Sequence, residues 1–237
     1  MTPTLYYCYD AYCGWCYGFS PVIRRVFEEY GGRGSGAGSP AQGSDDGSPA
    51  RLAFEVLSGG MILPEKPQPI GVMAPYIQKA YKTVEEHTGI KFGKDWLWHI
   101  FNPEESDWYP SSEKPAIALC VFKEYYPDLA VPFAADLQYA LHEEGRDLTD
   151  DEAYRHLLEK YGIPDGEFYQ RLHDPVYKAK AYEEFALVKQ LGVTGFPTVF
   201  VQVSESRLYL LSRGYTDYET LRTAIERVLE AAGAQTE

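Results

Sequence analysis

Hydrophobic and polar positions follow two different periods along the chain, and these periods predict strands and helices. Residues 4–9 are rich in aromatic side chains, which is typical of a β-strand. In residues 14–30 the apolar positions recur at spacings of three and four, as on one face of a helix. Residues 51–57 alternate in part and predict a second strand, which ends at Gly59-Gly60.

The middle of the chain, from about residue 72 to 191, is predicted to be helical, with glycine and proline breaks. Thr149 is expected to cap one helix through a capping box with Glu152. The acidic pair Glu183-Glu184 is interpreted as part of a solvated helix face. The other predicted helices include one closed by Gly89, Pro115 to Tyr125, Val131 to His142, one started by Pro164, and Pro175 to Leu191, whereas residues 90–112 are not assigned.

Strand character returns at residues 198–203, and a turn at 204–206 leads to a hairpin partner at 208–211. Asp217 is expected to cap a last helix with a regular apolar stripe. The predicted order is therefore β-α-β, a long run of helices, and β-β-α. A βαβ unit requires a parallel strand pair, to which the hairpin adds antiparallel strands.

This order predicts an α/β protein with a thioredoxin-like fold (β-α-β … β-β-α) and a large inserted all-helical subdomain. Residues 1–65 would form the first half of the thioredoxin-like domain and residues 191–237 the second half. Residues 66–190 would form the insert. Residues 31–50 are rich in glycine and serine and predict a flexible surface loop. Within them, Gly32-x-Gly34-x-x-Ala37 follows a helix instead of a strand, which argues against a dinucleotide-binding motif.

The composition narrows the classes of partner and the cellular location. The formal net charge is −13, with 35 acidic and 22 basic residues. Such a surface repels phosphate backbones and anionic membranes, so we expect neither as a partner. The N-terminus lacks the features of a secretory signal, and no stretch approaches 18 consecutive apolar residues. These features predict a cytoplasmic protein.

Cys13-Gly14-Trp15-Cys16 lies where the first strand turns into the first helix. At a helix start, free amide donors and the positive end of the helix dipole favour a thiolate on Cys13. Cys16, one turn deeper, would resolve a mixed disulfide by attacking Cys13. Trp15 would offer an apolar face beside the nucleophile. The same spacing also fits half of a zinc site.

The second candidate segment is Gly195-Phe196-Pro197, just before the third strand. Proline is tolerated at the first position of a strand. A cis Phe196–Pro197 bond would leave backbone groups free to pair with an extended peptide. Most X–Pro bonds are trans, so the residues alone leave the isomer open.

Together these segments resemble the DsbA-type branch of the thioredoxin superfamily, especially its cytoplasmic, FrnE-like members. The matching segments are 6–10, 13–18, 142–150 and 191–198. The resemblance implies a dithiol-disulfide oxidoreductase in which the helical insert forms one wall of the substrate groove. No cofactor is expected, and the partners would be protein or glutathione-like thiols and disulfides.

The resemblance also implies site residues: Cys13 as the attacking thiol, Cys16 as the resolving thiol, and Pro197 as a cis-proline facing the pair. Trp15, Gly195, Phe196 and Pro197 would bind the substrate. Phe196 is bulkier than the usual residue before the cis-proline, which would narrow the groove or change substrate release. The Gly14-Trp15 dipeptide has no cation, so a strongly oxidising potential is not expected.

Other polar residues near the pair have more than one interpretation. Asp10 would either accept the proton of Cys16 or bond the amides of the turn. Cys8 and Cys120 would be buried free thiols, or Cys8 would be an auxiliary thiol beside the pair. Their spacing with Cys13 and Cys16 also matches one iron–sulfur pattern. The five histidines show no metal spacing, so no metal site is predicted.

Two alternative functions remain open. The insert-bearing fold also resembles kappa-class glutathione transferases and hydroxychromene-carboxylate isomerases, which bind glutathione and generally have serine where Cys13 stands. A non-catalytic thioredoxin-fold protein that binds a metal or a peptide is the other alternative, with Cys8, Cys13 and Cys16 as metal ligands.

Overall fold

The structure is a computed structural model that describes residues 2–31 and 51–233. It contains one four-stranded sheet in the order β2-β1-β3-β4. Strand β1 pairs in parallel with β2 and antiparallel with β3, which pairs antiparallel with β4. This arrangement confirms the predicted α/β, thioredoxin-like fold. The strands are β1 Thr4–Tyr9, β2 Ala53–Ser58, β3 Thr198–Ser204 and β4 Arg207–Arg213.

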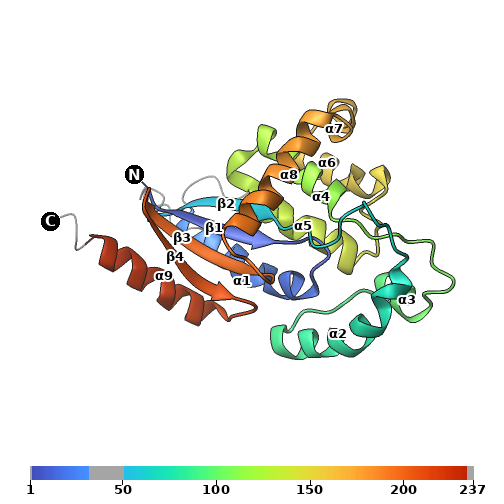
Figure 1. Cartoon of the computed structure of the whole chain (residues 1–237), viewed down its shortest axis with the longest axis horizontal. Coiled ribbons are helices and arrows are strands. Elements are labelled where there is room, and N and C mark those ends of the chain that lie inside the picture. The colour runs from blue at the N-terminus through green and yellow to red at the C-terminus, as the bar shows by residue number, and fades with distance from the viewer. Residues whose placement is uncertain (1, 32–50, 234–237) are drawn as a thin grey trace.

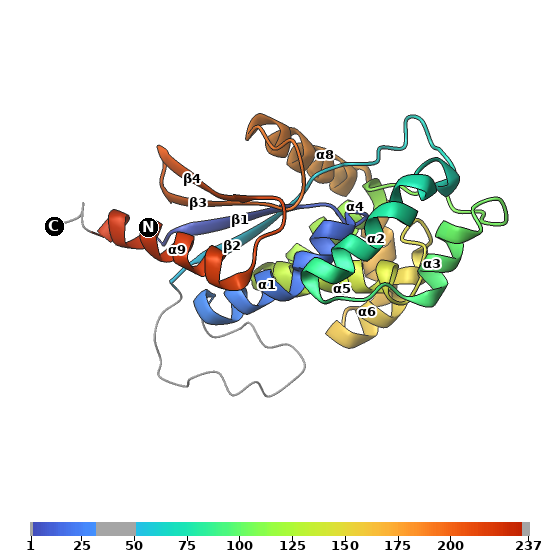
Figure 2. The ribbon, with the colours of Figure 1, turned by 90° about the horizontal axis from the view of Figure 1, so that it is seen from below.

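Helices cover both faces of the sheet and gather beyond one of its ends. Helices α1 and α9 lie on one face and α8 on the other, whereas α2 and α3 lie beyond the end where β1 finishes (Figures 1 and 2). Helix α5 packs against α1 and β2, and α4 packs against α8. The helices are α1 Gly14–Tyr30, α2 Ala74–Thr88, α3 Lys94–Phe101, α4 Glu113–Tyr125, α5 Ala130–His142, α6 Arg155–Tyr161, α7 Asp165–Leu172, α8 Pro175–Gln190 and α9 Tyr218–Gly233. The end of β1 therefore lies at the border between the sheet and the helical part.

Most predicted elements are confirmed to within a few residues, including α1 and the helix closed by Gly89, whose φ of 77° lies in the left-handed region. Asp217 caps α9, accepting the amide of Thr220 at 2.9 Å. The unassigned segment 90–112 contains α3. The predicted loop 31–50, with its Gly32, Gly34 and Ala37, lies outside the described residues except for Gly31.

The predicted capping box at Thr149 is wrong. Asp150 is the capping residue, and its carboxylate accepts the amide of Glu152 at 3.1 Å. The amide and the hydroxyl of Thr149 both donate to the carboxylate of Asp147, at 2.9 and 2.8 Å. Because this local bond engages the Thr149 side chain, it cannot serve as the cap. The turn that follows is a 3-10 helix, Asp151–Tyr154, which precedes α6.

The interpretation of Glu184 as a solvated residue is also wrong. Its side chain is 13% exposed and accepts from the Lys123 ammonium at 2.8 Å and from the Ser58 amide at 2.9 Å. Lys123 of α4 is itself largely buried and also binds Glu55 at 2.6 Å. A buried ammonium needs carboxylate partners, so the packing of α4 against β2 draws Glu184 inward.

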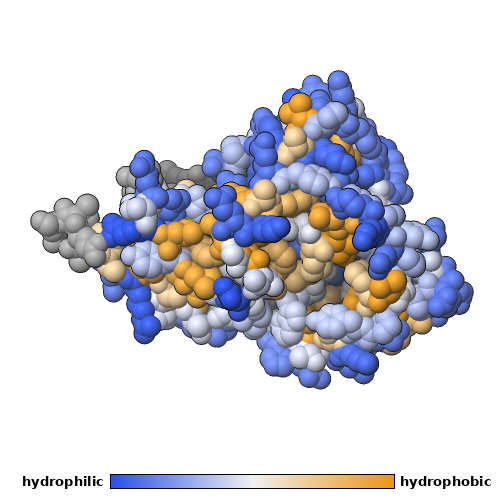
Figure 3. All heavy atoms as spheres, in the orientation of Figure 1, coloured by the Kyte–Doolittle hydropathy of each residue, from blue (hydrophilic) through white to orange (hydrophobic). Residues whose placement is uncertain are grey.

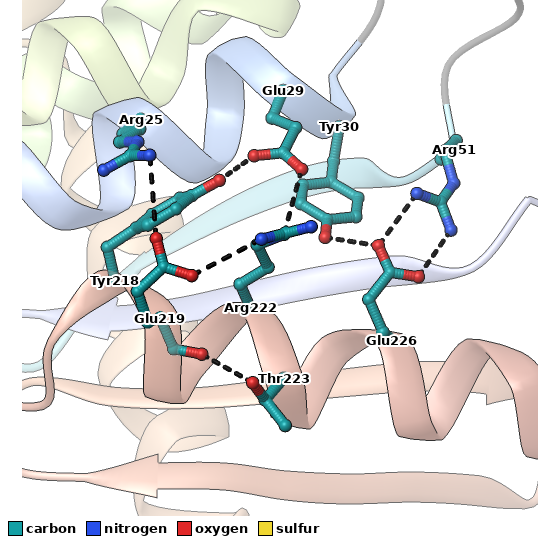
Figure 4. Close-up of polar contacts among 9 residues, drawn as sticks. All are labelled: Arg25, Glu29, Tyr30, Arg51, Tyr218, Glu219, Arg222, Thr223 and Glu226. Atoms are coloured by element: carbon teal, nitrogen blue, oxygen red, sulfur yellow. Dashed lines mark hydrogen bonds and ion pairs between the residues drawn. The ribbon is translucent and has the colours of Figure 1, made fainter.

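A second polar cluster joins the two chain segments on either side of residues 32–50 to α9 (Figure 4). The Tyr30 hydroxyl donates to Glu226 at 2.6 Å, and the Arg51 guanidinium binds both oxygens of that carboxylate. The carbonyl oxygen of Tyr30 also accepts the amides of Arg51 and Leu52. The end of α1 is thereby fastened to the start of β2.

On the face seen in Figure 3, apolar side chains gather over β3 and β4. Leu208 and Leu210 of the edge strand β4 are 40% and 48% exposed. Among the residues that the structure describes, no helix has the length and apolar character needed to cross a bilayer.

Candidate active site

The Cys13 side chain caps the N-terminus of α1. The chain turns after β1 through a bond from the Cys13 amide to the Asp10 carbonyl oxygen at 3.1 Å. The sulfur of Cys13 then accepts the amide of Cys16 at 3.3 Å and is 8% exposed. The sulfur therefore occupies the N-cap position, where the unpaired amides and the positive end of the helix dipole face it.

Cys16 lies one turn further into α1 and has no exposed surface. Burial raises the pKa of Cys16 well above its ordinary value, and a hydrogen bond with Cys13 and the charge of Cys13 add to the effect. The two thiols therefore differ in environment. The Cys13 side chain has a small exposed area, whereas the Cys16 side chain lies on the inner side of Cys13 and is fully buried.

The segment Gly195-Phe196-Pro197 reaches Cys13 from the far end of the chain. The Phe196–Pro197 peptide bond is cis, and the carbonyl oxygen of Phe196 lies 3.5 Å from the sulfur of Cys13, which donates to it. The Thr198 hydroxyl donates to the carbonyl oxygen of Gly195 at 2.8 Å. Tertiary packing thus brings together groups that are 183 positions apart in the sequence.

The ring of Phe196 packs against Gly59, directly after β2. A Cβ atom at Gly59 would overlap with this ring. The missing side chain at Gly59 therefore makes room for the Phe196 ring.

Trp15 is half-buried beside Cys13, between the helical part and the loop before α9. Its ring centroid lies 6.0 Å from the ring of His87 on α2 and 6.3 Å from that of Tyr215. These contacts hold an aromatic surface next to the Cys13 thiol, where an apolar part of a substrate would lie.

Asp10 is a buried anchor at the end of β1. Its carboxylate accepts the amides of Tyr12 at 3.0 Å and Met61 at 2.8 Å, and the hydroxyl of Ser112 at 2.9 Å. Burial raises the pKa of Asp10, and these three bonds oppose the shift. The contacts agree with the interpretation of Asp10 as a residue that bonds the amides of the turn.

Two residues of α5 that sequence reasoning missed hold the same turn from the helical side. Gln138 donates to the carbonyl oxygen of Asp10 at 3.4 Å, and Nε2 of His142 donates to that of Ala11 at 3.2 Å. These pairs are 128 and 131 residues apart. No local pattern signals them, because helical periodicity marks both side chains only as inward-facing.

The His142 imidazole is buried among the rings of Tyr17, Phe92 and Trp96, at centroid distances of 5.0 to 5.5 Å. Burial lowers the pKa of His142 to about 3, so the imidazole is neutral in the folded protein. Nε2 carries the proton, because its partner is a carbonyl oxygen.

We predict that His142→Gln flattens the acid dependence of stability. In the unfolded chain His142 binds a proton below about pH 6.5, whereas in the folded protein it does so only near pH 3. The wild type should therefore lose about 1 kcal/mol more than the variant for each pH unit between 6 and 4. Urea unfolding at pH 6, 5 and 4 measures both slopes. Equal slopes would show that His142 is protonated in the folded state.

Cys8 and Cys120 are both buried free thiols. Cys8 packs with Leu57, Val188 and Phe200 on the sheet face opposite Cys13 and Cys16, because successive side chains of a strand alternate between faces. Burial raises the pKa of Cys8 to about 12. The Cys120 thiol donates to Glu184 at 3.5 Å.

These positions do not support the iron–sulfur pattern or the metal-binding alternative. Within residues 2–31 and 51–233, no group of three or more histidine, cysteine or acidic side chains is arranged to hold a metal ion.

Comparisons with known proteins place this geometry in context. A search of curated protein sequences finds no match. A candidate protein disulfide isomerase from Nitrosomonas europaea aligns with 98% of this chain and 99% of its own, at 24% identity and a TM-score of 0.79. The cytosolic disulfide reductase DsbM from Pseudomonas aeruginosa aligns with 96% of this chain and 99% of its own, at 24% identity and a TM-score of 0.72.

DsbM has also been solved with GSH, and that structure gives 25% identity and a TM-score of 0.70 over 96% of this chain and 99% of its own. A 2-hydroxychromene-2-carboxylate isomerase covers 99% of both chains at 12% identity, with a TM-score of 0.61. At these low identities, the TM-scores and coverages show that the proteins share a fold. The sequence model of the DSBA-like thioredoxin domain matches residues 4–226, nearly the whole chain, and the protein therefore belongs to the DSBA-like thioredoxin domain family.

Proposed function

We propose that this protein is a thiol–disulfide oxidoreductase that uses Cys13 and Cys16. The observation that carries the proposal is the position of the Cys13 sulfur, between the Cys16 amide at 3.3 Å and the Phe196 carbonyl oxygen at 3.5 Å. The amide stabilises a thiolate, and the loop places backbone groups beside it for a substrate to pair with.

In the proposed reaction, the Cys13 thiolate attacks one sulfur of a substrate disulfide and releases the other as a thiolate. The product is a mixed disulfide on Cys13. Cys16 then attacks Cys13, so that the substrate leaves reduced and the Cys13–Cys16 disulfide forms. The pair gives up two electrons and the substrate gains them, and a reducing thiol restores the pair.

The proposed substrates are proteins or small disulfides such as oxidised glutathione, in the cytoplasm. Trp15, Gly195, Phe196 and Pro197 would form the binding surface around Cys13. The likeness to DsbM, a cytosolic reductase solved with GSH, supports this range. A reducing glutathione pool would keep the pair in the dithiol state and favour reduction or isomerisation. We assign Asp10 the role of an anchor for the turn, with proton transfer as a further role to test.

The test is a redox titration of the wild-type protein in glutathione buffers, followed by trapping of free thiols and mass spectrometry. We expect a reversible Cys13–Cys16 disulfide, with Cys8 and Cys120 remaining as thiols throughout. A stable glutathione adduct on Cys13 without that disulfide would instead favour the transferase or isomerase alternative. Absence of any change at Cys13 would rule out the proposed function.

A further inference from the structure

Tyr7 places a hydroxyl group beneath the active-site helix. It lies in β1, paired with Val56 of β2 and Val199 of β3, and is 1% exposed. Its ring belongs to the same buried cluster as Cys13 and Cys16 and lies 5.8 Å from the ring of Phe19 on α1. The strand pleat therefore aims this side chain at the inner side of the Cys13–Cys16 turn.

The Tyr7 hydroxyl is buried and completes no hydrogen bond in the dithiol form of the described structure. A buried hydroxyl without a partner is costly, and a partner that appears during function is one reason for a native structure to retain it. The titratable groups that act on it most strongly are Cys16 and then Cys13, and Cys16 is also in hydrogen-bonding reach. Burial raises the pKa of Tyr7 well above its ordinary value, so the hydroxyl keeps its proton and acts as a donor.

Asp10, the other buried polar side chain near Cys16, is already engaged. Its carboxylate accepts from Tyr12, Met61 and Ser112. Its negative charge raises the pKa of Cys16, whereas the hydrogen bond from the Asp10 backbone lowers it, so the carboxylate itself gives the Cys16 thiolate no support. Of the two buried groups, Tyr7 is the one suited to assist Cys16.

We propose that the Tyr7 hydroxyl is a catalytic hydrogen-bond donor that stabilises the Cys16 thiolate when Cys16 resolves the mixed disulfide on Cys13. This proposal rests on the function proposed above. In the resolving step the Cys16 sulfur forms a bond to the Cys13 sulfur, and the bond from Cys13 to the substrate breaks. The substrate leaves as a thiolate and takes up, through solvent, the proton that Cys16 released. Tyr7 keeps its own proton throughout.

The test separates the two chemical steps in Tyr7→Phe, with oxidised glutathione as the probe. Hydrogen bonds to charged groups predict that the mixed disulfide resolves at least about tenfold more slowly than in the wild type. Acid quenching and mass spectrometry follow the glutathione adduct on Cys13 over time. The rate at which iodoacetamide alkylates Cys13 should stay within about twofold of the wild type, because the variant leaves the α1 terminus intact.

Tyr9→Phe is the matched control. Tyr9 lies on the same strand and sheet face, is also 1% exposed, and interacts most strongly with Asp10 among charged groups. It should resolve the adduct at the wild-type rate. Equal lifetimes of the adduct in Tyr7→Phe and wild type would overturn the inference, as would equal slowing in both variants, which indicates packing. If the wild type itself forms neither adduct nor disulfide, the proposed function fails instead.

Discussion

Cys13→Ser is expected to lower the rate of insulin disulfide reduction by at least about a hundredfold, to the background without protein. A serine hydroxyl ionises far less readily than a thiol, so the amide of Cys16 and the helix dipole cannot produce a comparable nucleophile. The serine side chain has nearly the same shape and keeps the capping position of α1. The loss should therefore occur without a large change in stability, which thermal unfolding measures in parallel.

Two further cysteine variants separate the roles of the individual thiols. Cys16→Ser should also stop turnover, but it should accumulate the mixed disulfide on Cys13, because the resolving thiol is missing. Cys120→Ser is the control: this thiol is buried beside Glu184, away from the turn, and its loss should change the rate less than about twofold. Retained activity in Cys13→Ser would contradict the assignment, and so would an equal loss in Cys120→Ser.

Lys123→Met is expected to destabilise the protein by about 3–5 kcal/mol. The ammonium of Lys123 binds Glu55 at 2.6 Å and Glu184 at 2.8 Å, and its side chain is 18% exposed. Without the lysine, the carboxylate of Glu184 stays at 13% exposure without its counter-charge. Burial of an unpaired charge is the reason for the large effect. Urea unfolding with linear extrapolation measures the change.

Lys180→Met is the matched control, because Lys180 pairs with Glu124 on the surface, with side chains 42% and 43% exposed. Solvent screens such a pair, so its loss should cost at most about 1 kcal/mol. Adding Glu184→Gln to Lys123→Met should recover part of the stability, because it removes the unpaired charge. Equal effects of Lys123→Met and Lys180→Met would show that the inner cluster is solvated.

This cluster also bears on the candidate site. Glu184 accepts the amide of Ser58, and the next residue, Gly59, supports the ring of Phe196. The ion pair thus holds the end of β2 on which the loop before Pro197 rests.

Elements defined by local interactions were predictable from the sequence. Strand β1, helix α1 and the ends of α2 and α9 follow from apolar periodicity, a glycine at positive φ and an Asp cap. The order of the elements led to the thioredoxin-like fold, because a βαβ unit followed by a hairpin has few ways to form one sheet. The Cys13–Cys16 spacing and its place at a helix start were visible for the same reason.

Local patterns failed where several partners competed. Thr149 and Asp150 are both good capping residues. Asp150 is the cap because the Thr149 hydroxyl is hydrogen-bonded to Asp147. Glu184 was expected on a polar face, but the buried Lys123 draws it inward. In both cases the apolar periodicity is compatible with either structure. Polar contacts that the periodicity does not describe determined which one forms.

By itself, the sequence determined the elements, their order and a thiol pair at the start of a helix, since bonds within a few residues govern these features. Only the tertiary structure decided that the Phe196 carbonyl oxygen meets Cys13, that Gln138 and His142 hold the turn, and that Cys8 faces away. These outcomes depend on how strands and helices from distant parts of the chain pack together. Strand pairing and the helical part's contact with β1 set them, and no short-range pattern encodes such distances.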